Sequence, residues 1–206
     1  KDKSLLTHYF YEQKWNNGEL TLEELQIYAK EYFHLAKRIP GIVSRIKDRA
    51  PMNRPDLQEA IQENIDEETE HIALWKRFAI SLGVSDEEIE EYEASEKVKT
   101  AVMTLEHLAE TSFEEGVAAM YAMELELPAV AQSKKDGLCK FYGKDESDED
   151  AHIYFDEHLN EEEHFTVWRR IPVDCAIAKV AVEKFLAAQH QVLDGVCDAC
   201  GIECMC

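Results

Sequence analysis

The side chains in this sequence that are best suited to chemistry are glutamates and histidines in three separate stretches. The stretches are Glu67-Glu68-Thr69-Glu70-His71, Met123-Glu124-Leu125-Glu126 and His158-Leu159-Asn160-Glu161-Glu162-Glu163-His164. Carboxylates and imidazoles that come together from several helices hold pairs of redox metals in the cores of helical bundles. The pattern therefore predicts a metal pair that reacts with oxygen, which would make the protein an enzyme.

The first stretch contains a carboxylate and an imidazole at helical spacing. Glu68 and His71 are three residues apart and therefore neighbours on one helix face. Glu-x-x-His is also the spacing found in carboxylate-bridged di-metal bundles. Glu67 lies four residues before His71 and fits equally well, so the spacing leaves both glutamates open. The alternative interpretation is an acidic helix surface.

Glu124 is notable for its surroundings, because residues 116–128 are almost wholly apolar. A carboxylate within an apolar helix has to be paired, protonated or bound to metal, since a bare buried charge is too costly. The alternative to a metal is a buried Arg or Lys partner. Glu126 is the weaker candidate, because it points at a different helical angle.

The third stretch offers His158, Glu161 and His164, each three residues after the last. On a regular helix these side chains fan over ~120°. Glu157, Glu161 and His164 would share a tighter face, so helical phase leaves both Glu157 and His158 open. Carboxylate and imidazole ligands both suit iron and manganese.

The elements that must position these residues are all predicted to be helices, because apolar residues never alternate in the way that strands require. We expect seven substantial helices and two short ones in an all-α, single-domain bundle. The expected helices run from about residue 5 to 15, from the cap at Thr21 toward Pro40, from 42 to 48, from 55 to Gly83, briefly after the cap at Ser85, from 97 to 107 and onward, through Glu124 to Gly137 or Gly143, from 149 to 168 and from 173 to 192. Breaks are expected at Pro40-Gly41 and near Pro128. Aromatic residues at helical spacing near the N-terminus are predicted to be core.

Length, charge and cysteine usage limit the function classes. A chain of 206 residues is predicted to form one helical domain over residues 1–195. The net charge of −21 excludes nucleic acid as a partner, since phosphates would be repelled. No apolar run reaches the ~20 residues of a membrane span.

Four of the six cysteines, Cys197, Cys200, Cys204 and Cys206, form a predicted tail over residues 196–206. The tail could bind zinc, stay mobile or act as an external redox couple. The rest of the chain has too few cysteines for a secreted disulfide framework, so we expect a reducing cytoplasm.

The sequence also resembles a known family over most of its length. The segments that carry the resemblance are His8-Tyr-Phe-Tyr-Glu-Gln-Lys-Trp15, residues 18–32, residues 64–83, residues 118–143 and Tyr154-Phe-Asp-Glu-His158. They resemble the haem-oxygenase-like di-iron oxidases, in particular the 4-aminobenzoate synthases that consume one of their own tyrosines. The PQQ synthesis protein C and thiaminase-II-like families are looser relatives. Relative to the synthases, this chain has one extra residue between Tyr11 and Trp15.

The resemblance implies a haem-oxygenase-like bundle of seven to eight helices with two metal ions, Fe/Fe or Fe/Mn. It implies the use of molecular oxygen, an external reductant and a place in folate synthesis. The implied metal ligands are Glu68 or Glu67, His71, Glu124, His158, Glu161 and His164. Tyr11 matches the consumed tyrosine, Lys134 matches the amino-group donor, and Tyr28 and Tyr154 match further tyrosines. A homodimer is expected, with a reductase or a host protein as a candidate partner.

Two alternatives to the synthase stay open at this stage. One is a di-iron oxidase or oxygenase that acts on an external amino acid or fatty acid. The other is a protein-binding module with a vestigial metal site. The thiaminase function is disfavoured, because no cysteine occurs between residues 118 and 127, where the nucleophile of that family would fall.

Overall fold

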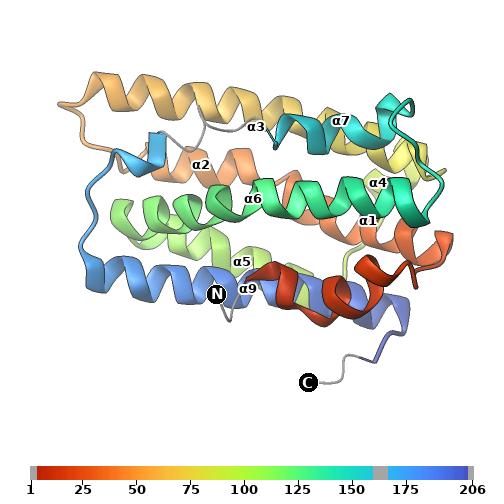
Figure 1. The fold of residues 1–206 in the computed structure, drawn as a ribbon. Helices are drawn as coiled ribbons and strands as arrows, with labels where there is room; N and C mark the ends of the chain where they lie inside the picture. Colours follow the sequence, from red (N-terminus) through yellow and green to blue (C-terminus); the bar gives the residue numbers. More distant parts are fainter. Residues whose placement is uncertain (1–3, 160–166, 204–206) are drawn as a thin grey trace.

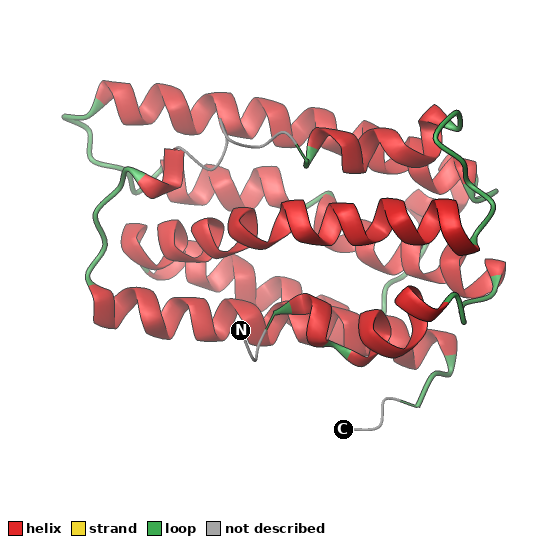
Figure 2. Ribbon diagram, viewed as in Figure 1, coloured by secondary structure: helices red, strands yellow, loops and turns green. Residues whose placement is uncertain are grey.

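Helices form the regular structure in the computed structural model, which describes residues 4–159 and 167–203 (Figures 1 and 2). The α-helices are Leu22–Ala36 (α1), Ile39–Lys47 (α2), Pro55–Ser81 (α3), Asp86–Glu91 (α4), Glu96–Thr111 (α5), Phe113–Phe141 (α6), Glu149–Glu157 (α7) and Cys175–Cys200 (α9). No strand occurs among the described residues. The predicted all-α class is confirmed.

Helix ends follow the capping signals of the sequence. Thr21 and Glu24 form a complete capping box at the start of α1, and Ser85 and Glu88 form another at the start of α4. In each box both side chains satisfy a backbone N–H that has no partner within the helix. Gly201 ends α9 in the left-handed conformation that favours glycine.

Of the two breaks predicted at prolines, the first lies a few residues earlier than expected and the second is absent. Helix α1 ends at Ala36 and α2 begins at Ile39, so that Pro40 lies in the first turn of α2, where a missing backbone N–H costs nothing. Pro128 lies inside the 29-residue helix α6, which continues through it to Phe141. A proline within a helix removes the hydrogen bond to the carbonyl four residues earlier, which is the carbonyl of Glu124.

Two predicted helix ends are also wrong. The helix expected over 149–168 ends at Glu157, and His158 is its C-cap. The helix expected to end at Val192 continues to Cys200 and crosses the boundary expected between residues 195 and 196. Its apolar face stays buried through Val196 and Cys197, so packing extends the helix.

The N-terminal segment, predicted as one helix over 5–15, is built from three short pieces. They are the 3-10 turns Leu5–Thr7 (η1) and Trp15–Asn17 (η3) and a π-helical turn Phe10–Lys14 (η2) between them. π-Helical turns occur frequently at functional sites. Tyr11 and Trp15 are both buried as a result.

The helices pack into one bundle whose core has two chemically different halves. In Figure 1, α3 lies along one side with α7 packed against it, and α9 lies along the opposite side next to α5 and the N-terminal segment. One half of the core is largely aliphatic and involves α2, α5 and the first half of α6. The other half is rich in Tyr, Trp and Phe and involves η2, α1, α3 and α7.

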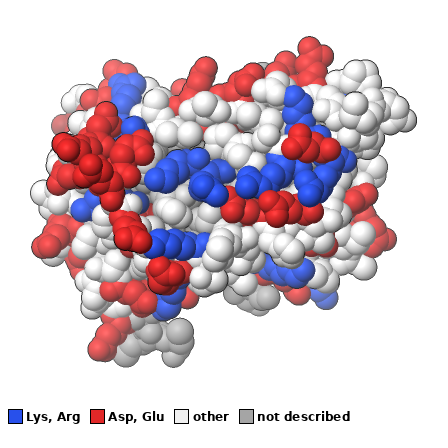
Figure 3. Space-filling model, turned by 180° about the vertical axis from the view of Figure 1, so that it is seen from behind, with Lys and Arg blue, Asp and Glu red and all other residues white. Residues whose placement is uncertain are grey.

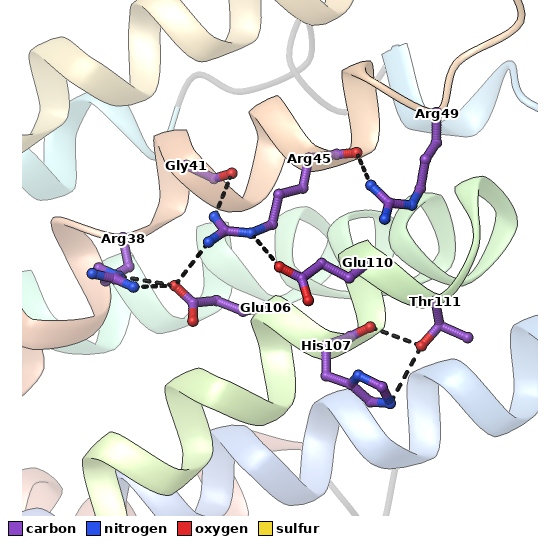
Figure 4. Close-up of polar contacts among 8 residues, drawn as sticks. All are labelled: Arg38, Gly41, Arg45, Arg49, Glu106, His107, Glu110 and Thr111. Carbon is purple, nitrogen blue, oxygen red and sulfur yellow. Dashed lines mark hydrogen bonds and ion pairs between the residues drawn. The ribbon is translucent and has the colours of Figure 1, made fainter.

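Charged side chains cover the surface of the bundle unevenly. On the face opposite to the view of Figure 1, basic residues gather in a band between acidic ones (Figure 3). Between α2 and α5, Arg38 pairs with Glu106, and Arg45 pairs with Glu106 and Glu110 (Figure 4). Exposed pairs of this kind contribute about 0–1 kcal/mol each. None of the described helices has the length and hydropathy of a membrane span.

Candidate metal and tyrosine site

Helix α3 places a carboxylate and an imidazole together in the core. Glu68 and His71 are buried, whereas Glu67 is only partly buried and Glu70 is exposed. The Glu68 Oε2 atom lies 3.4 Å from the His71 Nδ1 atom. Of the two glutamates that the spacing left open, Glu68 therefore is the one beside His71.

The end of α7 brings a second imidazole to His71. His158 is 2% exposed, and its ring centroid lies 4.6 Å from that of His71. Glu157 is exposed. Ala151 and Phe155 are buried seven and three residues before His158, so His158 continues the inward face of α7. The structure thus brings His158 to His71 and leaves Glu157 at the surface.

Glu124 lies on α6 and is 1% exposed. Leu127, Ala131 and Lys134 follow it at helical spacing on the same face of α6, and all three line a cavity that His158 also lines. Glu126 faces elsewhere, because its Oε2 atom accepts a hydrogen bond of 2.9 Å from the Leu5 backbone N–H.

The donors in this region fit an iron or manganese pair by type. Glu68, His71, Glu124 and His158 supply carboxylates and imidazoles, which are ligands that both metals accept. Within residues 4–159 and 167–203, no group of three or more His, Cys, Asp or Glu side chains is close enough together to hold a metal ion. Two expected ligands, Glu161 and His164, lie outside the described residues.

Lys134 is the most unusual side chain of the site, because a lysine is enclosed by aromatic rings. Its Nζ atom lies over four ring centroids, those of Trp15 (3.5 Å), Tyr28 (3.7 Å), Tyr11 (4.4 Å) and Phe10 (4.9 Å). Lys134 is 0% exposed, and Nζ has no hydrogen-bond partner among the described residues. Burial lowers the pKa of Lys134 well below its ordinary value. Burial therefore favours the neutral amine of Lys134 over the charged ammonium.

Two tyrosines of this enclosure, Tyr11 and Tyr28, contact the same amine, because the centroids of both rings lie within 4.4 Å of the Lys134 Nζ atom. Burial raises the pKa of both phenols well above the ordinary value, so both are protonated at neutral pH. Tyr11 thus presents a neutral phenol to the Lys134 side chain.

A small cavity connects the lysine enclosure with the histidines. It has a volume of about 10 Å³, which is close to the space that one water requires. Its lining includes Tyr28 and Lys134 on one side and Tyr154 and His158 on the other. The Tyr154 ring lies 4.3 Å from the His158 ring and 6.2 Å from the His71 ring, centroid to centroid. All four tyrosine and lysine positions expected from the sequence therefore belong to one region.

Two further residues of this region were not expected as functional. Tyr32 lines the cavity, and its ring is stacked on Trp75 at 4.8 Å. Burial, with a smaller effect from the Glu68 carboxylate, raises the pKa of Tyr32 to about 12. Trp75 lies four residues after His71, one turn further along α3. A sequence signal for both residues exists. Tyr32 follows Tyr28 by four residues and Trp75 follows His71 by four residues, and this spacing predicts that each pair shares one helix face.

The cysteine tail does not present a reactive thiol in the described part of the chain. Cys197 is fully buried in the aromatic half of the core. Burial raises the pKa of Cys200 to about 12, with smaller effects from Glu24 and Glu31, so its thiol stays protonated. Cys204 and Cys206 lie outside the described residues.

Comparison with known proteins places this bundle in a family. The model of the TENA/THI-4/PQQC family matches residues 1–198, and the chain belongs to this family. It is 40% identical to a 4-aminobenzoate synthase of Chlamydia muridarum over 163 residues, which cover 77% of this chain and 67% of the relative. It is 31% identical to a 4-aminobenzoate synthase of Chlamydia pneumoniae over 201 residues, 94% of this chain and 86% of the relative.

Solved structures confirm the haem-oxygenase-like fold that the sequence predicted. A TenA homologue from Pseudomonas syringae superposes with a TM-score of 0.76 at 14% identity, covering 96% of this chain and 87% of that chain. A domain from Shewanella denitrificans described as having a heme oxygenase-like fold gives a TM-score of 0.75 at 16% identity, covering 95% of this chain and 87% of that chain.

Proposed function

We propose that this protein is an oxygen-dependent 4-aminobenzoate synthase that consumes its own Tyr11 and takes nitrogen from Lys134. The observation that carries the proposal is the contact between the Lys134 amine and the Tyr11 ring, at 4.4 Å from Nζ to the centroid. Relatives named 4-aminobenzoate synthase, at 31–40% identity, support the same product.

The atoms of the product can be traced to these two side chains. 4-Aminobenzoate has a six-carbon ring with one further carbon, and a tyrosine ring with its Cβ atom supplies those seven carbons. The Cα–Cβ bond of Tyr11 must break, and Cβ must be oxidised to a carboxylate. The phenolic oxygen must be replaced by nitrogen, for which the Cε–Nζ bond of Lys134 must break.

The chain prepares both side chains for this chemistry. Burial of Lys134 favours its neutral amine, which keeps a lone pair that a protonated ammonium would lack. Tyr11 is 2% exposed, so water is excluded from its ring. The four rings around Nζ fix the amine against the tyrosine, and such positioning is a large part of catalysis.

Oxidation requires a group that the side chains do not provide. Two metal ions, Fe/Fe or Fe/Mn, would supply the activation of molecular oxygen with electrons from an external reductant. Glu68, His71, Glu124 and His158 would hold them, together with the expected ligands Glu161 and His164. In the chain itself, the hydrogen bond at His158 Nδ1 orients the ring for such a role.

The decisive experiment follows the mass of the protein itself. The chain is loaded anaerobically with iron and manganese and then exposed to oxygen with a chemical reductant, and the peptide that contains Tyr11 is measured before and after. We expect the loss of the Tyr11 side chain in parallel with the appearance of 4-aminobenzoate. An unchanged Tyr11 peptide after product formation would show that the substrate comes from elsewhere.

An external substrate is the second candidate function, and one observation favours it. An apolar cavity of about 440 Å³ lies between α6 and α9 and includes Val117, Tyr121 and Val182 in its lining. This volume is within the range of small-molecule sites. The same experiment separates the two functions, because an external substrate would leave the mass of the protein unchanged.

A further inference from the structure

The inward face of helix α3 carries three polar residues in succession. The buried residues of this helix follow the helical repeat and include Ile61, Asn64, Glu68, His71 and Trp75. Ile61 and Trp75 are the kind of apolar residue expected on a face that packs into a core. Asn64, Glu68 and His71 lie between them, so the polar part of this face is confined to about two turns of the helix.

Asn64 differs from the two other polar residues, because its side chain makes no hydrogen bond with the chain. It is 1% exposed, and neither Oδ1 nor Nδ2 has a hydrogen-bond partner among the described residues. Leaving a buried polar group without a partner is costly, and native proteins rarely do so. An amide buried in this way therefore needs a binding partner from outside the chain.

Neither helix formation nor packing explains an amide at position 64. Asn64 lies in the interior of the 27-residue helix α3, away from the end where Asn caps a helix. Asn is also a poorer helix former than Leu, and Leu would suit a buried position better. Since both considerations favour Leu, the amide is best explained by what it binds.

The neighbours of Asn64 indicate the chemistry of its partner. Glu68 follows it by four residues, a spacing that makes two side chains neighbours on one helix face. The Glu68 carboxylate lies beside His71, which in turn lies beside His158. Carboxylates, imidazoles and amide oxygens are all ligands of divalent metal ions such as manganese. An amide fits here at both ends, because its oxygen can bind a cation while its NH2 group donates to a carboxylate.

We propose that Asn64 is a further metal ligand of the candidate site and binds through Oδ1 on the Glu68 side of it. The proposal rests on the metal pair of the proposed function. Within residues 4–159 and 167–203, carboxylates, imidazoles and thiols alone do not form a group of three that could hold a metal ion. Asn64 adds a donor of another type, and because an amide is neutral, it adds no repulsion between carboxylates.

The substitution Asn64→Leu has opposite expected effects on the metal-free protein and on metal binding. Without metal, the variant should unfold at a higher urea concentration than wild type, because a buried amide without a partner is removed. Its affinity for Mn(II) should be at least ~10-fold weaker, since even the loss of a residue that only supports a ligand commonly weakens metal binding by this factor. Mn(II) is added under anaerobic conditions, and the free ion is measured by electron paramagnetic resonance.

Two further variants complete this experiment. Asn64→Asp keeps an oxygen donor at the same place, so it should retain Mn(II) binding and be less stable than wild type without metal, because an uncompensated carboxylate is buried. Gln62→Leu is the matched control, because Gln62 is an amide on the same helix that already bonds to Lys47 and Asp66. It should bind Mn(II) as wild type does. Should Asn64→Leu fail to fold, Asn64→Ala, which adds no bulk, takes its place.

The outcomes separate this proposal from the proposed function. Mn(II) affinity at the wild-type level in Asn64→Leu would overturn the proposal, whatever the stability of the variant, and an ordered water would then be the partner of the amide. Loss of Mn(II) binding in Asn64→Asp as well would also overturn it, because that variant still offers an oxygen. In both cases the metal pair of the proposed function stands. If wild type itself binds neither Mn(II) nor Fe(II), the metal pair fails, and Asn64 fails as a ligand with it.

Discussion

The His158 Nδ1 atom lies 2.6 Å from the backbone carbonyl oxygen of Tyr154. A carbonyl oxygen only accepts hydrogen bonds, so Nδ1 carries the proton and Nε2 is the unprotonated nitrogen of the neutral ring. Histidines that bind metals commonly use one nitrogen in this way to orient the other. The last turn of α7 thereby fixes both the position and the tautomer of His158.

This relationship predicts different results for two adjacent substitutions. His158→Ala should reduce the metal content measured after anaerobic loading with iron and manganese, because an imidazole next to His71 is lost. Glu157→Ala should leave metal content unchanged, because Glu157 is exposed. Metal content by atomic emission, with helicity by circular dichroism as the folding control, decides the matter. The reverse order of effects would show that Glu157 is the ligand.

The same measurement tests the two ligands from other helices. His71→Ala and Glu124→Ala should each abolish binding of the metal pair while the helical fold remains. Removing one ligand leaves fewer groups to hold the cations, and the remaining carboxylates repel one another. Glu70→Ala is the matched control, since Glu70 is exposed on the same helix as His71. Full occupancy by two metals in either ligand variant would refute the assignment.

Lys134→Met should make the metal-free protein more stable at pH 7. Burial lowers the pKa of Lys134 in the fold below its value in the unfolded chain, so folding releases a proton at any pH between the two values. Between its lowered pKa in the fold and its ordinary value of 10.5, the wild-type stability rises with pH by about 1.4 kcal/mol per unit. The advantage of the Met variant should therefore shrink as pH approaches 10.5.

Urea unfolding of both proteins at a series of pH values measures this difference. Lys140→Met is a suitable control, because Lys140 is an exposed lysine on the same helix, and its effect should not depend on pH in this way. A gain in stability for Lys134→Met that is the same at pH 7 and pH 10 would mean that Lys134 is charged in the fold.

Much of the fold follows from short-range sequence signals. The capping boxes at Thr21 and Ser85 give helix starts correctly, because a cap is satisfied by residues within one turn. The wrong predictions of helix breaks and ends occur where packing between residues far apart in the sequence decides how far a helix continues. Pro128 signals a break, yet α6 continues through it and packs against α5, α7 and α9. The end of α9 likewise depends on the burial of Cys197.

In the candidate site, too, local sequence signals identify some residues, whereas others depend on long-range packing. Glu-x-x-His spacing and an apolar setting single out His71 and Glu124, because both are local features. The choice between Glu157 and His158 could not be made from their phase relative to Glu161 and His164, because it depends on which face of α7 packs into the core, where Ala151 and Phe155 lie. The enclosure of Lys134 was also invisible without the resemblance, since its rings come from η2, η3 and α1, more than 100 positions away in the chain.

Acidification should loosen the N-terminal segment that carries Tyr11. His8 Nε2 lies 3.1 Å from Asp194 Oδ1, and its Nδ1 atom accepts a hydrogen bond of 3.1 Å from the Phe10 backbone N–H. Burial lowers the pKa of His8 below its ordinary value of 6.5, although Asp194 acts in the opposite direction and His190 is also near. The stabilisation is thus complete above pH 6.5 and is lost as pH falls through the lowered value.

Hydrogen exchange of the η2 amides reports this loosening. Protection should fall on acidification in wild type, because a protonated Nδ1 can no longer accept the bond from Phe10. A His8→Asn variant should show weak protection at all pH values. Protection in wild type that stays constant from pH 7 to pH 5 would exclude His8 as the cause.

Substitution of Tyr11 by Phe tests the proposed function most directly. If Tyr11 were only a core aromatic, Tyr11→Phe would cost no more than one hydrogen bond of its hydroxyl, about 1 kcal/mol, and the protein would behave as wild type. If Tyr11 is the substrate, the variant should bind both metals and produce no 4-aminobenzoate, because the phenol that is to be exchanged for an amine is missing.

Tyr28→Phe and Tyr154→Phe are the comparisons that give this result its meaning. Tyr28 shares the lysine enclosure, and Tyr154 lies next to both histidines, so each is an alternative source of the ring. Each variant is tested for growth of a bacterial strain that cannot make 4-aminobenzoate and by mass spectrometry of the protein after oxygen exposure. If Tyr11→Phe still supports growth, the tyrosine whose peptide loses its side chain is the substrate. An intact set of tyrosine peptides would instead favour an external substrate.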